Sequence, residues 1–231
     1  MHTRLGARSA GMLGNFRRLR GHTLNAEESE PLVSIHPPPS AHPGHEGGER
    51  APEGVVVDDN KVYFYVPVTD TNVLQLNQAL RALDVEMRCL AVRFGLSEPM
   101  PIELHIHSDG GSLFSGFAAA DTIRSLKTPV HTYVEGAAAS AATIMSVCGK
   151  KRFIAQSSLM LIHQLSALMV EGTHEQFRDE FTNQELLMAK IKDIYRAHTK
   201  LDEETLEDLL KHDLWLAADR CLELGLVDQV V

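Results

Sequence analysis

The spacing of hydrophobic and polar positions changes several times along the chain, and each change predicts a different element. Between residues 61 and 67, aromatic and β-branched residues gather in the run K-V-Y-F-Y-V-P, which is typical of a β-strand. From residue 70 the apolar positions recur every three or four residues, as on one face of a helix: Val73, Leu76, Leu80, Leu83 and Met87. Asp70 or Thr71 is the expected cap of this helix.

Short apolar runs and helical spacings continue to alternate as far as residue 163. We expect strands and helices in turn at these positions: strands at 102–107, 130–135, 152–155 and 159–163, and helices at 113–125 and 140–148. A turn of small residues is expected at 136–139, immediately before Ser140. Strands that alternate with helices in this way predict an α/β domain.

The C-terminal part of the chain is expected to be mainly helical. Thr173 and Gln176 have the three-residue spacing of a capping box. The long helix that follows should carry one apolar side, made of Phe177, Phe181, Leu187, Ile191 and Ile194. Asp202 is placed to start another helix, and Gly225 stands where a helix C-terminal glycine belongs.

The N-terminal part lacks these patterns. Residues 36–45 mix Pro, Gly and His, and such a segment cannot bury enough apolar surface to offset the entropy of ordering it. We therefore expect a disordered tail at 1–55 and one domain at 56–231. Residues 1–26 hold five Arg and no acid, so an organellar transit peptide is an alternative to a plain basic leader. Without such a signal, the expected location is the cytoplasm.

Charge and cysteine content narrow the classes of function. The formal net charge is −9, and the first fifty residues hold six Arg and five Glu, so the rest of the chain carries about −10. An acidic body argues against binding nucleic acid or an anionic membrane. Cys89, Cys148 and Cys221 are far apart and form no C-x-x-C pair, which indicates neither a disulfide framework nor a zinc ribbon. No apolar run approaches the roughly 18 residues of a membrane span.

Two segments have the residues of a nucleophilic site. Gly110 and Gly111 stand between an expected strand and an expected helix, where backbone amides can bind a developing oxyanion, although a Gly-Gly pair is often only a turn. Ser140 follows three alanines and opens a helix, so its small neighbours leave room for a carbonyl group and the amide of Ala141 can point at it. The alternative for Ser140 is a helix N-cap.

Two further segments offer a base and an acid. His163 ends an apolar strand, a position that is rigid and partly desolvated, as a general base requires. Its alternative role is a buried histidine bonded to backbone. Asp213 precedes an apolar segment and can orient an imidazole, or else it is a helix cap or a surface acid. The order and spacing of all four segments, and no single residue, favour a nucleophile, base and acid set.

Taken in order, these segments resemble the Clp protease proteolytic-subunit (ClpP) family of serine peptidases. The matching segments are S-D-G-G at 108–111, Gly116, D-T-I at 121–123, G-A-A-A-S at 136–140, I-H-Q at 162–164, H-T at 198–199, D-L-W at 213–215 and G-L-V-D at 225–228. The resemblance extends from about residue 60 to residue 231, which is nearly the whole region that is expected to be ordered.

The resemblance implies a complete site and an assembly. The family's catalytic triad falls on Ser140, His163 and Asp213, and its oxyanion hole falls on the amides of Gly111 and Ala141. The implied fold is a crotonase-like ββα superhelix with a long handle helix. The implied assembly is a ring of seven subunits, commonly stacked in pairs, which encloses the active sites and receives unfolded chains from an AAA+ unfoldase. No metal or organic cofactor is implied.

Two departures from the family pattern lie close to the expected site. Asp109 replaces a proline beside the glycines of the oxyanion hole, and we expect its carboxylate to point to solvent. The segment at 165–170 replaces a proline and a glycine-rich strand that pairs with the substrate in the family. These differences bear on substrate alignment and on activity.

Other departures concern partners. His212 and Leu214 flank the expected acid at positions that matter to ring pairing in the family, so a double ring is less firmly implied than a single one. Glu103 and His105 stand where relatives often carry aromatic residues of the unfoldase-docking cleft. His105 and His107 also share a strand face, which leaves a metal pair as an alternative. Divergence of this kind is similar to that of phage and accessory members.

Three other functions fit parts of the sequence. A catalytically silent ring subunit is favoured by Asp109 and by the altered segment after His163, but the complete triad weighs against it. A crotonase-type acyl-CoA enzyme shares the fold, but no basic pocket for the CoA phosphates is evident. A Ser–Lys peptidase could use Lys150 or Lys151 as base, but the sequence shows no membrane anchor. We therefore predict a serine endopeptidase that cleaves unfolded proteins or peptides inside a ring-shaped chamber.

Overall fold

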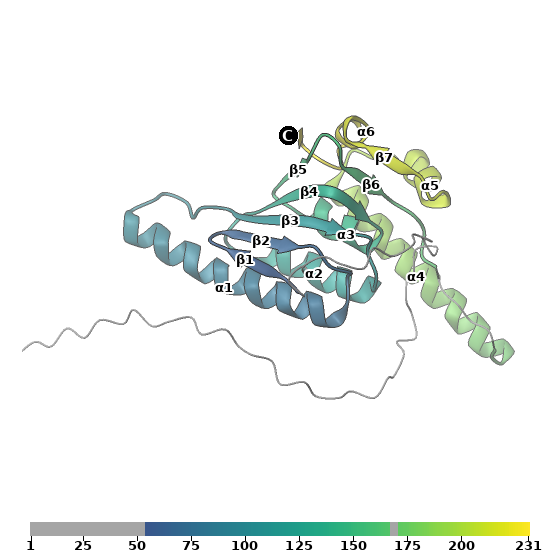
Figure 1. The fold of residues 1–231 in the computed structure, drawn as a ribbon. Coiled ribbons are helices and arrows are strands. Elements are labelled where there is room, and N and C mark those ends of the chain that lie inside the picture. The colour runs from purple at the N-terminus through teal and green to yellow at the C-terminus, as the bar shows by residue number, and fades with distance from the viewer. Residues whose placement is uncertain (1–53, 167–170) are drawn as a thin grey trace, which may run out of the picture. The chain divides into compact units, whose positions relative to one another are not determined.

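An eight-stranded sheet forms the centre of the chain in the computed structural model, which describes residues 54–166 and 171–231 (Figure 1). Its strands are β1 (Val56–Asp58), β2 (Lys61–Phe64), β3 (Ile102–Ser108), β4 (Val130–Ala139), β5 (Lys151–Ile154), β6 (Leu159–Leu161), β7 (Trp215–Ala217) and β8 (Gln229–Val230). The predicted tail at 1–55 lies outside the described residues except for its last two positions, as do residues 167–170 of the altered segment.

Six helices accompany the sheet in the described residues. They are α1 (Asp70–Phe94), α2 (Leu113–Ser125), α3 (Ala141–Val147), α4 (His174–His198), α5 (Glu203–Lys211) and α6 (Ala218–Glu223), and α1 and α2 lie along β2 and β3 (Figure 1). The helical spacing in α1 and the alternation in the strands place fully buried side chains opposite each other, among them Leu76, Leu80, Leu104 and Ile106. Each such side chain stabilises the fold by about 1.5–3 kcal/mol.

The long strand β4 divides the sheet into two parts. Along the path β1-β2-β3-β4-β5-β8, residues 131–134 of β4 pair in parallel with β5. Residues 137–139 of the same strand pair in parallel with β6, which in turn pairs antiparallel with β7. One strand therefore connects the β5–β8 part of the sheet to the β6–β7 part.

The helix ends follow the sequence signals closely. Thr173 and Gln176 form the predicted capping box of α4, and the Asp202 carboxylate accepts from the backbone of Thr205 at the start of α5. Gly225 follows α6 with a φ of 67°, as expected of a glycine that ends a helix. The cap of α1 is Thr69, so the expectation of Asp70 or Thr71 was wrong by one or two residues.

Some expected elements were wrong. Residues 136–139 are not a turn but the second half of β4, because their backbone groups pair with β6. The strand expected at 159–163 ends at Leu161, before His163. On the apolar side expected for α4, Phe177 and Phe181 are 46% and 63% exposed, since only the C-terminal half of α4 packs on the core.

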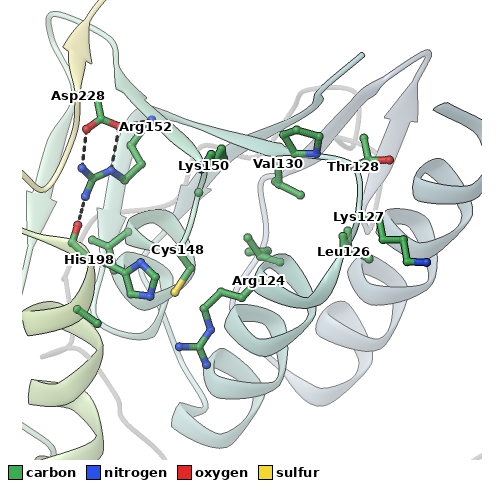
Figure 2. A pocket seen from close by; sticks show the side chains of 15 residues that line it. Arg124, Leu126, Lys127, Thr128, Val130, Cys148, Lys150, Arg152, His198 and Asp228 are labelled. Atoms are coloured by element: carbon green, nitrogen blue, oxygen red, sulfur yellow. Dashed lines mark hydrogen bonds and ion pairs between the residues drawn. The ribbon is translucent and has the colours of Figure 1, made fainter. Parts of the chain in front are cut away.

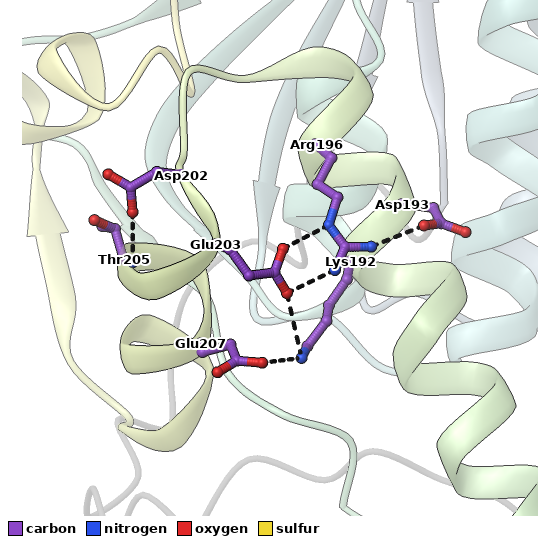
Figure 3. Close-up of polar contacts among 7 residues, drawn as sticks. All are labelled: Lys192, Asp193, Arg196, Asp202, Glu203, Thr205 and Glu207. Atoms are coloured by element: carbon purple, nitrogen blue, oxygen red, sulfur yellow. Dashed lines mark hydrogen bonds and ion pairs between the residues drawn. The ribbon is translucent and has the colours of Figure 1, made fainter.

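Ion pairs hold α5 against α4 (Figure 3). Arg196 of α4 donates to Glu203 at 2.6 Å and to Asp193 at 2.9 Å, and Lys192 reaches Glu207 at 2.8 Å. The buried apolar side chains of α5, Leu206 and Leu210, add to this attachment. None of the helices in the described ranges is both long and apolar enough to cross a bilayer.

Candidate active site

The pairing of three strands brings the predicted catalytic residues toward one another. Leu161 of β6 pairs with the last residue of β4 on one side and with the first residue of β7 on the other. Ser140 directly follows β4, His163 lies two residues beyond Leu161, and Asp213 lies two residues before β7. Because β7 runs antiparallel to β6, the residues after β6 and before β7 leave the sheet at the same edge.

Ser140 has a strained backbone and an uncommitted side chain. Its φ of 54° and ψ of −125° lie outside the regions that L-residues commonly adopt, which costs about 1–3 kcal/mol. Its amide donates to the carbonyl of Leu161 at 2.9 Å, so the sheet holds the turn in place. Ser140 occupies the N-cap position of α3, as the alternative expected, but its side chain makes no capping hydrogen bond. Ser140 as a whole is 8% exposed.

His163 and Asp213 form an ion-pair contact of 3.1 Å between Nδ1 and Oδ1. The His163 side chain is 8% exposed and the Asp213 side chain is 61% exposed. The contact is to a carboxylate, so the alternative of a backbone-bonded histidine does not hold. The other ring nitrogen, Nε2, is buried and has no hydrogen-bond partner among the described residues. A buried polar atom without a partner calls for an explanation.

The glycine turn packs directly on the serine. Val68 donates its N–H to the carbonyl of Gly110 at 2.8 Å and accepts from Ser112 at 2.8 Å, so the amide of Gly111 between them points away from Val68. A Cβ on Gly110 would lie 2.7 Å from the Cβ of Ser140. Only glycine permits this approach, and Gly110 has a φ of 94° as well. The sequence indicated the glycine pair but not that Gly110 touches Ser140.

The amides of the expected oxyanion hole are available. Neither Gly111 N–H nor Ala141 N–H meets an acceptor among the described residues. Gly111 comes from the turn before α2, and Ala141 is the first residue of α3. Two unpaired donors near a nucleophile are the requirement for stabilising a tetrahedral intermediate.

Two residues that the sequence analysis did not single out contact the serine turn. Thr143 donates its hydroxyl to the carbonyl of Ser140 at 2.6 Å, and the Tyr195 hydroxyl lies 2.6 Å from that of Thr143. Burial raises the pKa of the Tyr195 phenol, which therefore stays protonated. The signal for Thr143 was a polar residue in a helix turn of otherwise small and apolar residues. Tyr195 was hidden among the apolar positions of α4.

The departures near the site are accommodated at the surface. Asp109 is exposed, as expected, so its carboxylate faces solvent. His105 stacks between Tyr63 and Tyr133 with ring centroids 4.8 Å from each, on the face of the sheet away from α1. Its Nδ1 lies 2.8 Å from Glu135. Across the described residues, no group of three or more His, Cys, Asp or Glu side chains is placed to hold a metal ion.

A basic pocket of about 630 Å³ lies at the opposite end of β4 (Figure 2). Its cationic side chains are Arg124, Lys127, Lys150 and Arg152. No basic pocket was evident from the sequence. Val130, the first residue of β4, lines this pocket, whereas Ser140 follows the last residue of β4. The full length of the strand separates the two. The pocket is therefore not part of the candidate active site and gives no support to an acyl-CoA enzyme that uses Ser140.

Comparisons with known proteins show what this chain is similar to. The Clp protease family model matches residues 56–231. The ATP-dependent Clp protease proteolytic subunit 1 of Chlamydia caviae is 32% identical over 183 residues, which cover 76% of this chain and 88% of that protein. The ATP-dependent Clp protease proteolytic subunit of Deinococcus radiodurans is 33% identical over 134 residues, covering 56% of this chain and 64% of its own length.

A solved structure shares the fold. A point mutant of ClpP1 from Listeria monocytogenes superposes with a TM-score of 0.63 at 20% sequence identity, covering 75% of this chain and 91% of that one. The predicted fold class, an α/β superhelix of this type with a long helix, is confirmed, and α1 and α4 are both 25 residues long.

Proposed function

Because this chain belongs to the Clp protease family, we propose that it is a serine endopeptidase that hydrolyses peptide bonds of unfolded proteins or peptides. Ser140 is the nucleophile, His163 the general base and Asp213 the acid that orients it. The observation that carries this proposal is the 3.1 Å contact of His163 Nδ1 with Asp213, together with the unpaired, buried Nε2. A carboxylate beside Nδ1 and an unpaired Nε2 are the arrangement that a serine nucleophile needs from its base.

The reaction follows from these positions. His163 Nε2 takes the proton of the Ser140 hydroxyl as the oxygen attacks the peptide carbonyl, and the amides of Gly111 and Ala141 donate to the oxyanion. His163 then returns the proton to the leaving amine, and the peptide bond breaks. A water molecule, deprotonated by the same nitrogen, releases the acyl group from Ser140. Asp213 remains ionised and stabilises the imidazolium.

We also propose that the chain acts in a ring of seven subunits, singly or as a stacked pair, fed by an AAA+ unfoldase. The peptidase domain is residues 56–231. The named relatives are subunits of ATP-dependent proteases. Large apolar side chains are exposed on the single chain, as at a surface that other subunits cover: Phe177, Phe181, Leu214 and Trp215. Native mass spectrometry measures the number of subunits directly.

The first test is intact-mass analysis after treatment with a fluorophosphonate probe. We expect one adduct, mapped to Ser140, that is lost in Ser140→Ala along with peptide cleavage, while the oligomeric state is unchanged. Cleavage that persists in the purified variant would refute Ser140 as nucleophile. A folded, oligomeric wild type that forms no adduct would favour the catalytically silent ring subunit.

A further inference from the structure

Two buried hydroxyl groups form a chain that ends on the backbone of Ser140. Thr143 is fully buried and Tyr195 is 2% exposed. The Thr143 Oγ1 donates to the Ser140 carbonyl at 2.6 Å, and the Tyr195 hydroxyl lies 2.6 Å from Thr143 Oγ1. These two hydrogen bonds link α4 to the first turn of α3, and they connect residues that are 52 positions apart in sequence.

The direction of these two hydrogen bonds follows from the number of hydrogens on each hydroxyl group. A hydroxyl group has one hydrogen, and that of Thr143 goes to the Ser140 carbonyl. The Tyr195 hydroxyl must therefore be the donor to Thr143. Burial raises the pKa of the Tyr195 phenol, so the donor proton stays in place throughout the pH range in which proteins are folded.

The carbonyl that accepts from Thr143 shares a peptide unit with the Ala141 N–H, a proposed donor to the oxyanion. The Ser140 C=O and the Ala141 N–H belong to the same peptide bond, which is planar and trans. In a trans peptide these two groups point in opposite directions. The Ser140 carbonyl accepts from Thr143 twice, from its N–H at 3.0 Å and from its hydroxyl at 2.6 Å. These bonds fix the plane and so fix the direction of the Ala141 N–H.

The strained backbone at Ser140 makes such a restraint necessary. A residue at φ 54° and ψ −125° keeps this conformation only when its surroundings hold it there. The amide of Ser140 is bonded to Leu161, which restrains the side before the serine. The hydroxyls of Thr143 and Tyr195 restrain the side after it.

We propose that Thr143 and Tyr195 are positioning residues that hold the Ser140–Ala141 peptide so that the Ala141 N–H faces the oxyanion. The catalytic consequence rests on the proposed peptidase function, whereas the restraint on the peptide does not. Neither side chain touches the reacting atoms. Their effect on the reaction is therefore expected in the transition state, where the oxyanion forms, and not in substrate binding.

The kinetic test compares variants that keep the shape of each side chain. Tyr195→Phe and Thr143→Val each remove a hydroxyl, and we expect kcat to fall about tenfold or more with KM nearly unchanged, less than the 10²–10³-fold loss of a whole oxyanion donor. Thr143→Ser keeps the hydroxyl and should retain most of the activity. The kcat of the double variant should be no lower than that of Thr143→Val, because both changes interrupt the same series of hydrogen bonds.

Ser146→Ala is the matched control. Ser146 lies on the same helix, is fully buried, and its hydroxyl has no hydrogen-bond partner among the described residues. Removing this hydroxyl should leave kcat unchanged. A fall in kcat for Tyr195→Phe no greater than that of the control, or a parallel rise in KM, would overturn the positioning role.

A second measurement does not depend on activity. Hydrogen exchange followed by mass spectrometry reports the protection of amides in the segment 140–147, where the Thr143 N–H is bonded to Ser140. We expect faster exchange of this segment in Tyr195→Phe and Thr143→Val than in Ser146→Ala. Equal exchange in all three overturns the restraint. If the wild type shows neither cleavage nor a fluorophosphonate adduct, the peptidase proposal fails, and the exchange data still decide whether the two hydroxyls hold the peptide.

Discussion

The two ends of β4 differ in how completely their polar groups are paired. At the start of the strand, Arg152 donates to both carboxylate oxygens of Asp228 and to the carbonyls of His198 and Gly225 (Figure 2). At the other end, Ser140 is strained and its side chain caps nothing. The buried Nε2 of the base and the two amide donors beside it also lack partners among the described residues.

The start of β4 is therefore expected to contribute to stability, and the end of β4 to reactivity. Paired groups at the start of β4 lower the energy of the folded state, since each hydrogen bond to a charged group contributes about 1.5–3 kcal/mol. Unpaired groups at its end raise that energy and keep atoms available for a substrate. Substitutions at the first end should therefore change the free energy of unfolding, and substitutions at the second should change the rate of the reaction.

The largest expected effect is that of Asp213→Asn at the reactive end. The amide would favour the wrong imidazole tautomer, and we expect kcat to fall about 10⁴-fold, as in serine proteases with this change. Thermal unfolding should shift little, because the Asp213 side chain is 61% exposed. Asp208→Asn, which removes a nearby surface carboxylate, is the control for charge alone. A near-normal rate in Asp213→Asn would make Asp213 a surface acid.

The second comparison uses two glycines, one at each end of β4. A Cβ at Gly110 would meet the Ala139 carbonyl at 2.6 Å and the Ser140 Cβ at 2.7 Å, whereas a Cβ at Gly149 would meet the Thr132 hydroxyl at 2.5 Å. Both alanine variants should lower the melting temperature. Only Gly110→Ala displaces the nucleophile, and a shift of about 1 Å costs roughly a hundredfold in kcat. Equal loss of activity in both would show that crowding acts through global stability.

A smaller effect is expected from Arg152→Met at the paired end. The Arg152 side chain is 12% exposed, and its loss leaves the carbonyls of His198 and Gly225 without this donor. We expect the free energy of unfolding to fall by about 2 kcal/mol in denaturant titrations. The kcat of the remaining folded enzyme at 25 °C should be that of the wild type. A large fall in kcat would mean that the two ends of β4 are coupled.

The smallest effect concerns pH. The hydrogen bond from Arg152 holds the pKa of Asp228 below its usual range. A carboxyl group with a lowered pKa contributes stability above its unfolded pKa of about 3.9, and this contribution is lost as the pH falls through the folded value.

Unfolding measurements on the wild type and Asp228→Asn can detect this change. The difference in unfolding free energy should be constant from pH 5 to 7 and shrink below about pH 4. We expect it to be less than about 1 kcal/mol, because the Asp228 side chain is 44% exposed and solvent screens the pair. A difference that does not change with pH would assign the effect to packing.

The sequence predicted the elements that have strong periodicity or clear caps. The capping box at Thr173 and the spacing from Val73 to Met87 depend on residues close together in the chain, so local rules are enough to find them. The short strands β7 and β8 were not predicted, because two or three residues carry no period. They form only through pairing with distant strands.

The candidate site divides in the same way. The proposed triad and the proposed oxyanion residues, Gly111 and Ala141, were predicted from the order of motifs, which the family resemblance made specific. The roles of Gly110, Thr143 and Tyr195 depend on contacts across 30 to 52 positions, which no local pattern records. The error at residues 136–139 has the same origin. A run of small residues is typical of a turn, and these residues form a strand because they pair with β6, which is distant in sequence.

The attachment of α5 to α4 has a consequence for the response to ionic strength. Asp213 lies two residues after α5, and the pairs that hold this helix, from Arg196 and Lys192 to Glu203 and Glu207, are at the surface (Figure 3). Dissolved ions weaken such pairs as the Debye length shortens from about 10 Å at 0.1 M to about 3 Å at 1 M. The orienting acid is thus tied to the protein partly through contacts that salt loosens, while the nucleophile is held by buried bonds that salt does not reach. We therefore expect ionic strength to affect the position of Asp213 more than that of Ser140.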